Sequence, residues 1–145
     1  AVDGVAAKRD RALELGATRV LDPGELVDQD VRADVVVEAA GSARAFEGAF
    51  AATAPGGRTV TVGLPHPDAR AAVSPLQLVA EARTVIGSYL GSAVPSRDIP
   101  RFAQWWREGR LPVEALLSSR ISLDEINAAM DELAAGRAVR QLVDL

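Results

Sequence analysis

Asp34-Val35-Val36-Val37-Glu38 is the stretch of this sequence that decides the fold. A continuous run of β-branched apolar residues, with no polar residue in alternation, is typical of a strand that a parallel sheet buries on both faces. The segments before and after it are rich in Ala, Leu, Arg and Glu, which favour helices. We therefore predict a buried parallel strand over residues 34–38, set among helices.

Short apolar strands and helical segments alternate along the rest of the chain, which is the pattern of an α/β fold. The expected helices are Val5–Leu15, Ala43–Ala52, a helix that begins at Ser74-Pro75, Ser96–Glu108, and a helix that Ser122 caps and Gly136 ends. The expected strands are Arg19–Leu21, Thr59–Gly63, Thr84–Leu90 and Val139–Val143, and Asp22-Pro23-Gly24 is expected to form a turn. This alternation predicts a mainly parallel sheet with helices on both faces.

Composition excludes several classes of site and partner. The chain has 145 residues, of which 48% are hydrophobic and 25% are charged, as is typical of one globular domain. The net charge of −4 argues against nucleic acid or an anionic membrane as a partner, and no apolar run is long enough to cross a membrane. With no cysteine and one histidine, the chain has no disulfide or thiolate chemistry and few ligands for zinc.

The amino-terminal residues Ala1-Val2-Asp3 are typical of the end of a strand, and the helix that follows carries Lys8. In a dinucleotide-binding fold, an acid at the end of the second strand binds the adenosine ribose. A glycine-rich phosphate loop lies about 20 residues before such an acid, and no G-x-G-x-x-G occurs in this sequence. We therefore expect an incomplete fold, with the first strand and the glycine-rich loop missing, and we expect the segment to be inactive alone.

Both residues also have an interpretation that involves no ligand. Asp3 also fits an ordinary acid in the turn after a strand, and Lys8 also fits a solvated lysine on a helix. Lys8 is, however, the single lysine among 16 basic residues. An ammonium and a guanidinium are not equivalent at a ribose or a phosphate, which favours a specific role for Lys8.

A set of short motifs follows in order along the chain. After Asp3 and Lys8 they are Gly16-Ala17-Thr18, Val37-Glu38-Ala39-Ala40-Gly41, Gly56-Gly57-Arg58, Val62-Gly63-Leu64-Pro65, Gly87-Ser88-Tyr89-Leu90-Gly91, Gly109-Arg110-Leu111 and Gly136-Arg137-Ala138-Val139-Arg140. Together they resemble the coenzyme domain of the zinc-dependent alcohol dehydrogenases, in the medium-chain dehydrogenase superfamily, over essentially the whole chain. The resemblance implies a Rossmann-type, doubly wound sheet. Residues 1–145 would then be part of the NAD-binding domain with its carboxyl-terminal helix and strand, and the catalytic zinc domain would be absent.

The same resemblance implies roles at the adenosine and pyrophosphate end of NAD. Asp3 would accept hydrogen bonds from the ribose, and Lys8 would lie beside the same ribose. A carboxylate at this position repels the 2′-phosphate of NADP, which favours NAD. Arg140 matches an arginine that reaches the pyrophosphate, and it also fits a surface charge on an edge strand.

Further cofactor contacts are implied where three strands end, the edge at which ligands bind in open α/β sheets. They are Ala39, Ala40 and Gly41 beside the cofactor, Val62, Gly63 and Leu64 beneath the nicotinamide, and Ser88, Tyr89 and Leu90 at its carboxamide. The small residues would let the backbone approach the cofactor closely. The segment 62–64 also fits a strand that simply leaves the core.

The resemblance implies an oxidoreductase of the alcohol dehydrogenase type, cytoplasmic, with no nucleic-acid or membrane partner. Hydride would pass between NAD and a small-molecule alcohol or aldehyde, zinc would be held by residues outside this chain, and no residue of the chain would be a chemical catalyst. A homodimer through Thr84–Leu90 is expected, because an unpaired strand edge is a liability. The alternatives are a zinc-free medium-chain quinone or enoyl reductase, which usually uses NADPH, and a non-catalytic nucleotide-binding or oligomerisation remnant.

Overall fold

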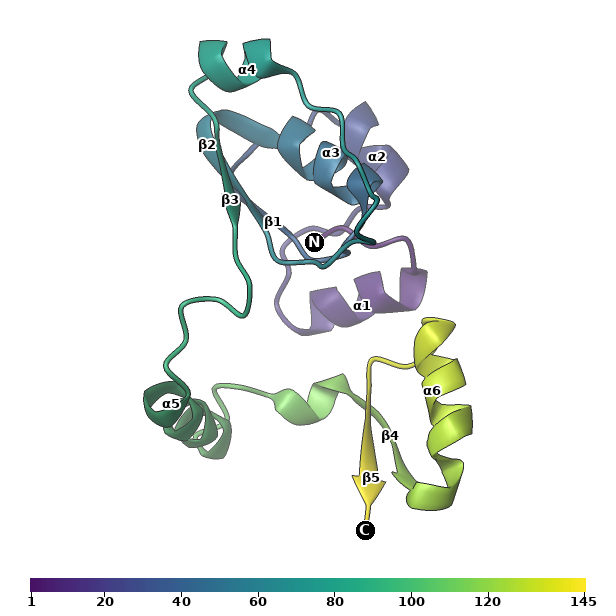
Figure 1. The fold of residues 1–145 in the computed structure, drawn as a ribbon. Coiled ribbons are helices and arrows are strands. Elements are labelled where there is room, and N and C mark those ends of the chain that lie inside the picture. The colour runs from purple at the N-terminus through teal and green to yellow at the C-terminus, as the bar shows by residue number, and fades with distance from the viewer. The chain divides into compact units, whose positions relative to one another are not determined.

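A computed structural model describes all residues from 1 to 145, which form two compact units, Ala1–Ala93 and Val94–Leu145 (Figure 1). None of the helices has the length and apolar character needed to cross a membrane. The predicted α/β class with parallel sheets is confirmed, because every pair of neighbouring strands in both units is parallel.

The first unit is built around a three-stranded sheet in the order β1-β2-β3. Its elements are α1 (Ala6–Glu14), α2 (Pro23–Asp28), β1 (Ala33–Glu38), α3 (Ala43–Ala51), β2 (Thr53–Thr61), α4 (Pro75–Ala80) and β3 (Thr84–Gly87). Val37 pairs with Val60, which in turn pairs with Ile86. The parallel strand predicted over residues 34–38 is therefore confirmed as β1.

The core of this unit lies between the sheet and α3, which Figure 1 shows together with α2 on one side of the strands. Ala49 and Phe50 of α3 are buried. Thr53 and Thr59 of β2 are fully buried, and their hydroxyl oxygens lie 2.7 Å apart. The Thr53 hydroxyl also donates to the carbonyl of Ala49 at 2.9 Å. These buried hydroxyls join the start of β2 to the end of α3.

The opposite face of β1 is open. Val35 and Val37, which alternate with the residues facing α3, are 53% and 60% exposed. Successive side chains of a strand point to opposite faces. The predicted burial of this strand on both faces is therefore wrong, because on the other face Val36 is half-buried and only Glu38 is fully buried.

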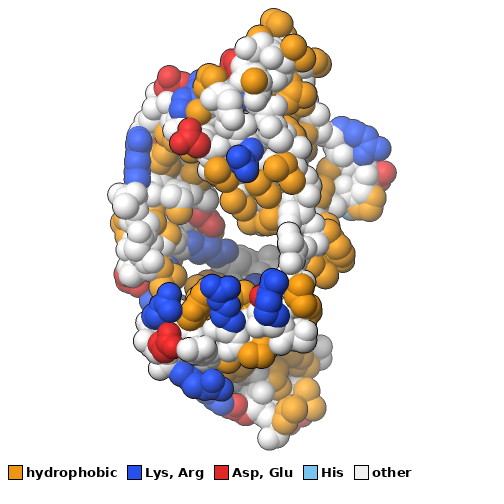
Figure 2. All heavy atoms as spheres, turned by 90° about the vertical axis from the view of Figure 1, so that its left-hand side faces the viewer, with side chains coloured by type: hydrophobic (Ala, Val, Ile, Leu, Met, Phe, Trp, Pro, Cys, Tyr) orange, Lys and Arg blue, Asp and Glu red, His pale blue; other side chains and the backbone are white.

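α4 is a surface helix whose start follows from two residues. Ser74 is its N-cap and accepts the N–H of Gln77 at 3.3 Å, and Pro75 occupies the first helical position, as predicted. Leu76 and Val79 are 75% and 79% exposed, and Figure 2 shows hydrophobic side chains at the top of the molecule, over this helix. The helix therefore adds little to the core.

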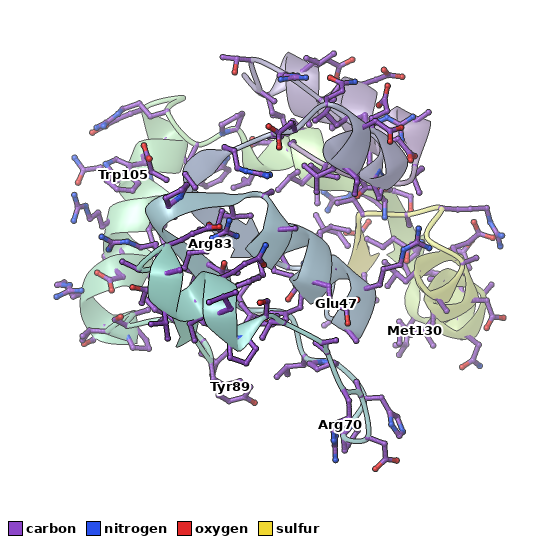
Figure 3. All side chains as sticks on the ribbon, turned by 90° about the horizontal axis from the view of Figure 1, so that it is seen from above. Glu47, Arg70, Arg83, Tyr89, Trp105 and Met130 are labelled. Atoms are coloured by element: carbon purple, nitrogen blue, oxygen red, sulfur yellow. The ribbon has the colours of Figure 1, made fainter.

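Arg83 joins the start of β3 to the end of α3 from inside the first unit. Its side chain is 3% exposed and pairs with the Glu81 carboxylate. The guanidinium also donates to the carbonyl of Phe50 and lies 5.1 Å from the centroid of that ring. Figure 3 shows Arg83 among the ribbons of the first unit, whereas Arg70 projects outward from a loop.

The second unit contains a two-stranded parallel sheet, β4-β5, with α6 against it. Its elements are α5 (Pro95–Arg107), a 3₁₀ turn at Val113–Leu116, β4 (Leu117–Ser122), a second 3₁₀ turn at Leu123–Glu125, α6 (Ile126–Ala134) and β5 (Arg140–Asp144). Ala129 of α6 is buried, and an ion pair between Arg120 and Asp144 joins the two strands. Because Ser122 and Glu125 form a capping box, the predicted cap of this helical segment is confirmed.

The turn predicted at Asp22-Pro23-Gly24 is wrong, because Asp22 is the N-cap of α2 and Pro23 is its first residue. The Asp22 carboxylate accepts the N–H of Gly24 at 2.9 Å, and the Glu25 carboxylate accepts the N–H of Asp22 at 2.7 Å. With Pro23 at the first helical position, this capping box starts a helix at a sequence that ordinarily marks a turn.

Two predicted strands of the first unit have different bounds. The strand predicted over 59–63 runs from Thr53 to Thr61. It pairs with β1 on both sides of the Pro-Gly-Gly segment, and the register shift between Ala33 and Val35 accommodates that segment. The strand predicted over Arg19–Leu21 is reduced to one isolated parallel bridge between Leu21 and Val2.

The strand predicted as Thr84–Leu90 is also shorter than expected. It ends at Gly87, and Leu90 has a φ of +57°, outside the extended region. The predicted dimer strand therefore consists of four paired residues followed by a loop.

Two further differences lie in the second unit. The sequence does not predict β4, because Ser118, Ser119 and Arg120 interrupt its apolar pattern; pairing with β5 supplies its order. Ser96 is not the cap of α5. Val94 is the N-cap, and its N–H donates to the Asp98 carboxylate at 2.8 Å.

Candidate cofactor-binding edge

The three parallel strands of the first unit end at one edge, and the predicted contact residues follow them directly. Residues 39–41 follow β1, residues 62–64 follow β2, and residues 88–90 follow β3. The N–H of Ser88 donates to the carbonyl of Thr61 at 3.0 Å, and a Cβ added to Gly41 would lie 2.9 Å from the carbonyl oxygen of Leu64. The structure therefore brings these three segments together.

Glu38, the last residue of β1, joins the ends of β1 and β2. Its side chain is buried, and its carboxylate accepts the N–H of Gly41 at 2.7 Å and the hydroxyl of Thr61 at 2.7 Å. Its own carbonyl accepts the N–H groups of Val62 at 2.8 Å and of Gly63 at 3.2 Å. One residue thus holds both the turn after β1 and the segment after β2.

Gly41 and Gly63 lie against each other with no room for a side chain. A Cβ added to Gly63 would lie 2.2 Å from the nitrogen and 2.5 Å from the Cα of Gly41. Gly41 also has a φ of +69°, in the left-handed region that glycine favours. The small residues predicted to admit a cofactor are therefore required for the contact between the two segments.

A cavity of about 210 Å³ lies beside this contact, between the start of α3 and the loop after β2. It is lined by Glu38, Ser42, Ala43, Phe46, Thr61, Gly63, Pro65, Ala69 and Ala71. Glu47 of α3 holds the same loop, because its carboxylate accepts the N–H of Ala72 at 2.7 Å. The cavity is therefore largely apolar, with one buried carboxylate in its wall.

The segment after β3 is more open than the other two. Tyr89 and Leu90 are 71% and 85% exposed, and their N–H groups donate no hydrogen bond within the chain. Figure 3 shows Tyr89 pointing away from the ribbons of the first unit. This part of the edge therefore keeps free donors.

Asp3 lies at the end of the bridge between Val2 and Leu21 and is half-buried. Its N–H donates to the carbonyl of Leu21 at 3.2 Å, and its carboxylate Oδ1 accepts the N–H of Val5 at 2.8 Å. Its Oδ2 accepts no hydrogen bond within the chain. The backbone thus holds Asp3 while one carboxylate oxygen stays free to accept hydrogen bonds from a ligand.

Arg9 of α1 fixes the strand end that carries Asp3. Its Nη1 donates to the carbonyl oxygen of Asp3 at 2.6 Å and lies 3.4 Å from Oδ2 of Asp22. The guanidinium is therefore engaged by groups of the protein itself. Sequence analysis misses this role, and its only signal is that Arg9 lies on the helix directly after the acid.

Two predicted residues, Lys8 and Arg140, have no recorded hydrogen bond or ion pair with Asp3, and Arg140 belongs to the other unit. Lys8 lies on α1, half-buried, and no ion pair joins it to Asp3. Arg140 begins β5 in the second unit, is exposed, and donates to the carbonyl of Val139 at 2.7 Å. Their contacts with NAD stay predictions.

The chain contains no group of three or more His, Cys, Asp or Glu side chains that could hold a metal ion. The single histidine, His66, lies in an exposed loop with its Nδ1 3.6 Å from Oδ2 of Asp68. These residues do not fit a zinc site, and no zinc ligand is assigned to them.

Sequence analysis does not single out Glu38 or Thr61 as site residues. The signal for Glu38 is an acid that closes an otherwise apolar strand and precedes small residues. Thr61 lies 23 residues further along the chain, so its contact with Glu38 depends on how β1 and β2 pair.

Comparison with known proteins adds a family to this geometry. Residues 1–108 match the family model described as zinc-binding dehydrogenase. The chain belongs to the zinc-binding dehydrogenase family. It is similar to the geraniol dehydrogenase of Castellaniella defragrans, with 34% identity over 95% of the chain and 39% of that relative. It is also similar to the NDMA-dependent alcohol dehydrogenase of Amycolatopsis methanolica, with 32% identity over 99% of the chain and 41% of the relative. The chain thus spans about two fifths of the length of these relatives.

Solved structures agree with this family. An alcohol dehydrogenase zinc-binding domain protein from Burkholderia ambifaria has a TM-score of 0.92 and 27% identity, covering 99% of this chain and 40% of the solved chain. A zinc-binding dehydrogenase from Sinorhizobium meliloti 1021, bound to NADP, has a TM-score of 0.85 and 27% identity, covering 99% and 44%. The resemblance drawn from the motifs is therefore confirmed at the level of the family.

Proposed function

We propose that this dehydrogenase chain is the NAD-binding segment of a zinc-type alcohol dehydrogenase. The observation that carries the proposal is the meeting of the ends of β1, β2 and β3 at one edge, with residues 39–41, 62–64 and 88–90 side by side. Cofactors of open α/β sheets bind at this kind of edge. The reaction is reversible hydride transfer between NAD and an alcohol, giving an aldehyde or a ketone.

Asp3 binds the adenosine ribose in this proposal. Its free Oδ2 accepts hydrogen bonds from the ribose hydroxyls, and Lys8 lies at the same ribose. The carboxylate repels a 2′-phosphate, and Nη1 of the neighbouring Arg9 is held by the carbonyl of Asp3 and the carboxylate of Asp22. The segment therefore prefers NAD to NADP.

The strand ends orient the nicotinamide. When bound, NAD supplies the group that accepts hydride from the alcohol. Residues 62–64, held by Glu38, form a fixed wall beneath the ring. The free N–H groups of Tyr89 and Leu90 face the carboxamide, and Arg140 reaches the pyrophosphate. Zinc ligands and the substrate pocket belong to other residues of the enzyme, and a cytoplasmic location stays a prediction.

The dehydrogenase is a homodimer through β3 in this proposal. The order β1-β2-β3 leaves the outer edge of β3 without a partner strand. An unpaired edge favours association with another strand. A second copy of β3 supplies that strand.

Calorimetric titration of the protein expressed from its complete gene, with NAD and with NADP, tests the proposed function. We expect one NAD site per chain and binding of NADP that is at least about tenfold weaker. Asp3→Asn, which removes the charge, should reduce the ratio of the NADP to the NAD dissociation constant. Asp10→Asn, on the exposed side of α1, is the matched control and should leave it unchanged.

Each other outcome of the titration has a definite meaning. Equal or tighter binding of NADP would favour the zinc-free reductase alternative. Absence of binding by either dinucleotide contradicts the proposed function and leaves the non-catalytic alternative.

A further inference from the structure

Glu38 is a buried carboxylate with no cation beside it. It is 5% exposed, and it takes part in none of the ion pairs of the structure. Burying an ionised carboxylate without a counter-charge carries a large free-energy cost. An apolar residue would end this strand at a lower cost, so the two hydrogen bonds that the carboxylate accepts are its specific contribution.

Those two hydrogen bonds act on the two segments that meet at the edge. The Gly41 N–H belongs to the turn after β1, and the Thr61 hydroxyl belongs to the end of β2. The two segments touch through backbone atoms at Gly41 and Gly63, where no side chain separates them. A movement of either carboxylate contact would therefore shift both segments together.

We propose that Glu38 is a positioning residue for cofactor binding, which acts through Gly41 and Thr61 and does not touch the cofactor. The proposal rests on the proposed NAD site, because residues 39–41 and 62–64 are its assigned contacts. Glu38 sets the distance between these two segments, and this distance determines whether both can contact one dinucleotide.

The chemistry of the side chain explains what the acid contributes. A carboxylate has two acceptor oxygens, so it can accept the Gly41 N–H and the Thr61 hydroxyl at the same time. A glutamine has the same shape, but one of its two terminal atoms is a donor. Because a hydroxyl both donates and accepts, Glu38→Gln can keep both contacts with the Thr61 hydrogen bond reversed, whereas Glu38→Met keeps a similar volume and removes both oxygen acceptors.

Three single variants of the complete protein separate positioning from general stability. Glu38→Met removes both oxygen acceptors, and Thr61→Val removes the hydroxyl that donates to the carboxylate. Thr53→Val is the matched control, because it removes a buried hydroxyl from the opposite end of the same strand. For each variant, NAD affinity is measured by calorimetry and the unfolding midpoint by thermal denaturation.

We expect Glu38→Met and Thr61→Val each to raise the NAD dissociation constant about tenfold, which corresponds to 1.4 kcal/mol. The double variant should bind NAD as tightly as the single variant with the lower affinity, because both changes act on one contact. Thr53→Val should lower the unfolding midpoint and leave the NAD dissociation constant unchanged.

Two results would overturn the positioning role. One is unchanged NAD affinity in both Glu38→Met and Thr61→Val, and the other is a loss of affinity in Thr53→Val equal to theirs. Failure of the unaltered protein to bind NAD is a separate result. It contradicts the proposed function itself and is read from the same titration before any variant is compared.

Discussion

The edge of the sheet has a fixed part and an open part. At the ends of β1 and β2, Glu38 is buried, and Gly41 lies in backbone contact with Gly63. At the end of β3, Tyr89 and Leu90 are exposed and their N–H groups are free. The same kind of strand end therefore has two different structural states within one small unit.

The difference shows which contacts exist before a ligand arrives. The ends of β1 and β2 are held by hydrogen bonds within the chain, so their conformation does not depend on a cofactor. The segment after β3 has few such contacts, and its N–H groups at Tyr89 and Leu90 are free for a ligand. A site with a preformed wall and an adaptable side loses little entropy at the wall when it binds.

Gly63→Ala should have the largest effect, because it acts on the fixed part. The added methyl would lie 2.2 Å from the nitrogen of Gly41, and moving that backbone away costs free energy. We expect the free energy of unfolding to fall by about 3 kcal/mol. Gly87→Ala, at the end of β3 with nothing within 4 Å of the added methyl, is the control and should change stability by less than about 0.5 kcal/mol. Equal effects of the two substitutions, measured by chemical denaturation, would remove the distinction between the two parts.

Val85→Pro tests the open edge of β3 and should have the next largest effect. Ser88 donates to β2 at Thr61, and backbone groups alternate in direction along a strand, so the N–H of Val85 points to the free edge. Proline there removes only the N–H that points to the free edge. We expect the dissociation constant of the dimer to rise about tenfold, which corresponds to 1.4 kcal/mol. Ile86→Pro, whose N–H points to β2, should instead destabilise the subunit itself. Sedimentation equilibrium measures the first effect; an unchanged dimer constant in Val85→Pro would contradict assembly through β3.

Leu90→Gly should have the smallest effect, and it should be stabilising. A non-glycine residue in the left-handed region costs about 1–2 kcal/mol, and glycine loses about 0.5–1 kcal/mol more entropy on folding. We therefore expect a gain of about 0.5 kcal/mol in thermal or chemical unfolding. Leu90→Ala keeps the strained φ of +57° and should show no gain. A loss of stability in Leu90→Gly would show that the leucine side chain makes contacts that matter.

Local signals in the sequence predict much of the fold. The apolar run 34–38, the Ser74-Pro75 helix start and the Ser122–Glu125 capping box each act through neighbouring residues, and each is found where predicted. The failures depend on distant partners. β2 extends through a Pro-Gly-Gly segment because a register shift in its pairing with β1 accommodates it, and β4 exists because β5 pairs with it.

The residues of the candidate site also divide into those that the sequence pattern predicts and those that require the folded structure. Residues that follow strand ends, such as Gly41, Gly63 and Ser88, can be placed at the edge from the strand pattern alone. The hydrogen bonds of Glu38 with Thr61, and of Arg9 with Asp3, require the folded geometry. Glycine at positions 41 and 63 is predicted correctly as part of the edge, but the structure shows that it serves the contact between two segments.

Hydrogen exchange of the backbone amides, with and without saturating NAD, tests the central claim most directly. The account predicts that the amides of Gly41, Val62 and Gly63 are protected without NAD, because Glu38 accepts all three. On addition of NAD, the amides of Tyr89 and Leu90 should gain the largest protection. Protection by NAD confined to elements away from the ends of β1, β2 and β3, or rapid exchange at Gly41 and Gly63 without NAD, would contradict a preformed cofactor-binding edge.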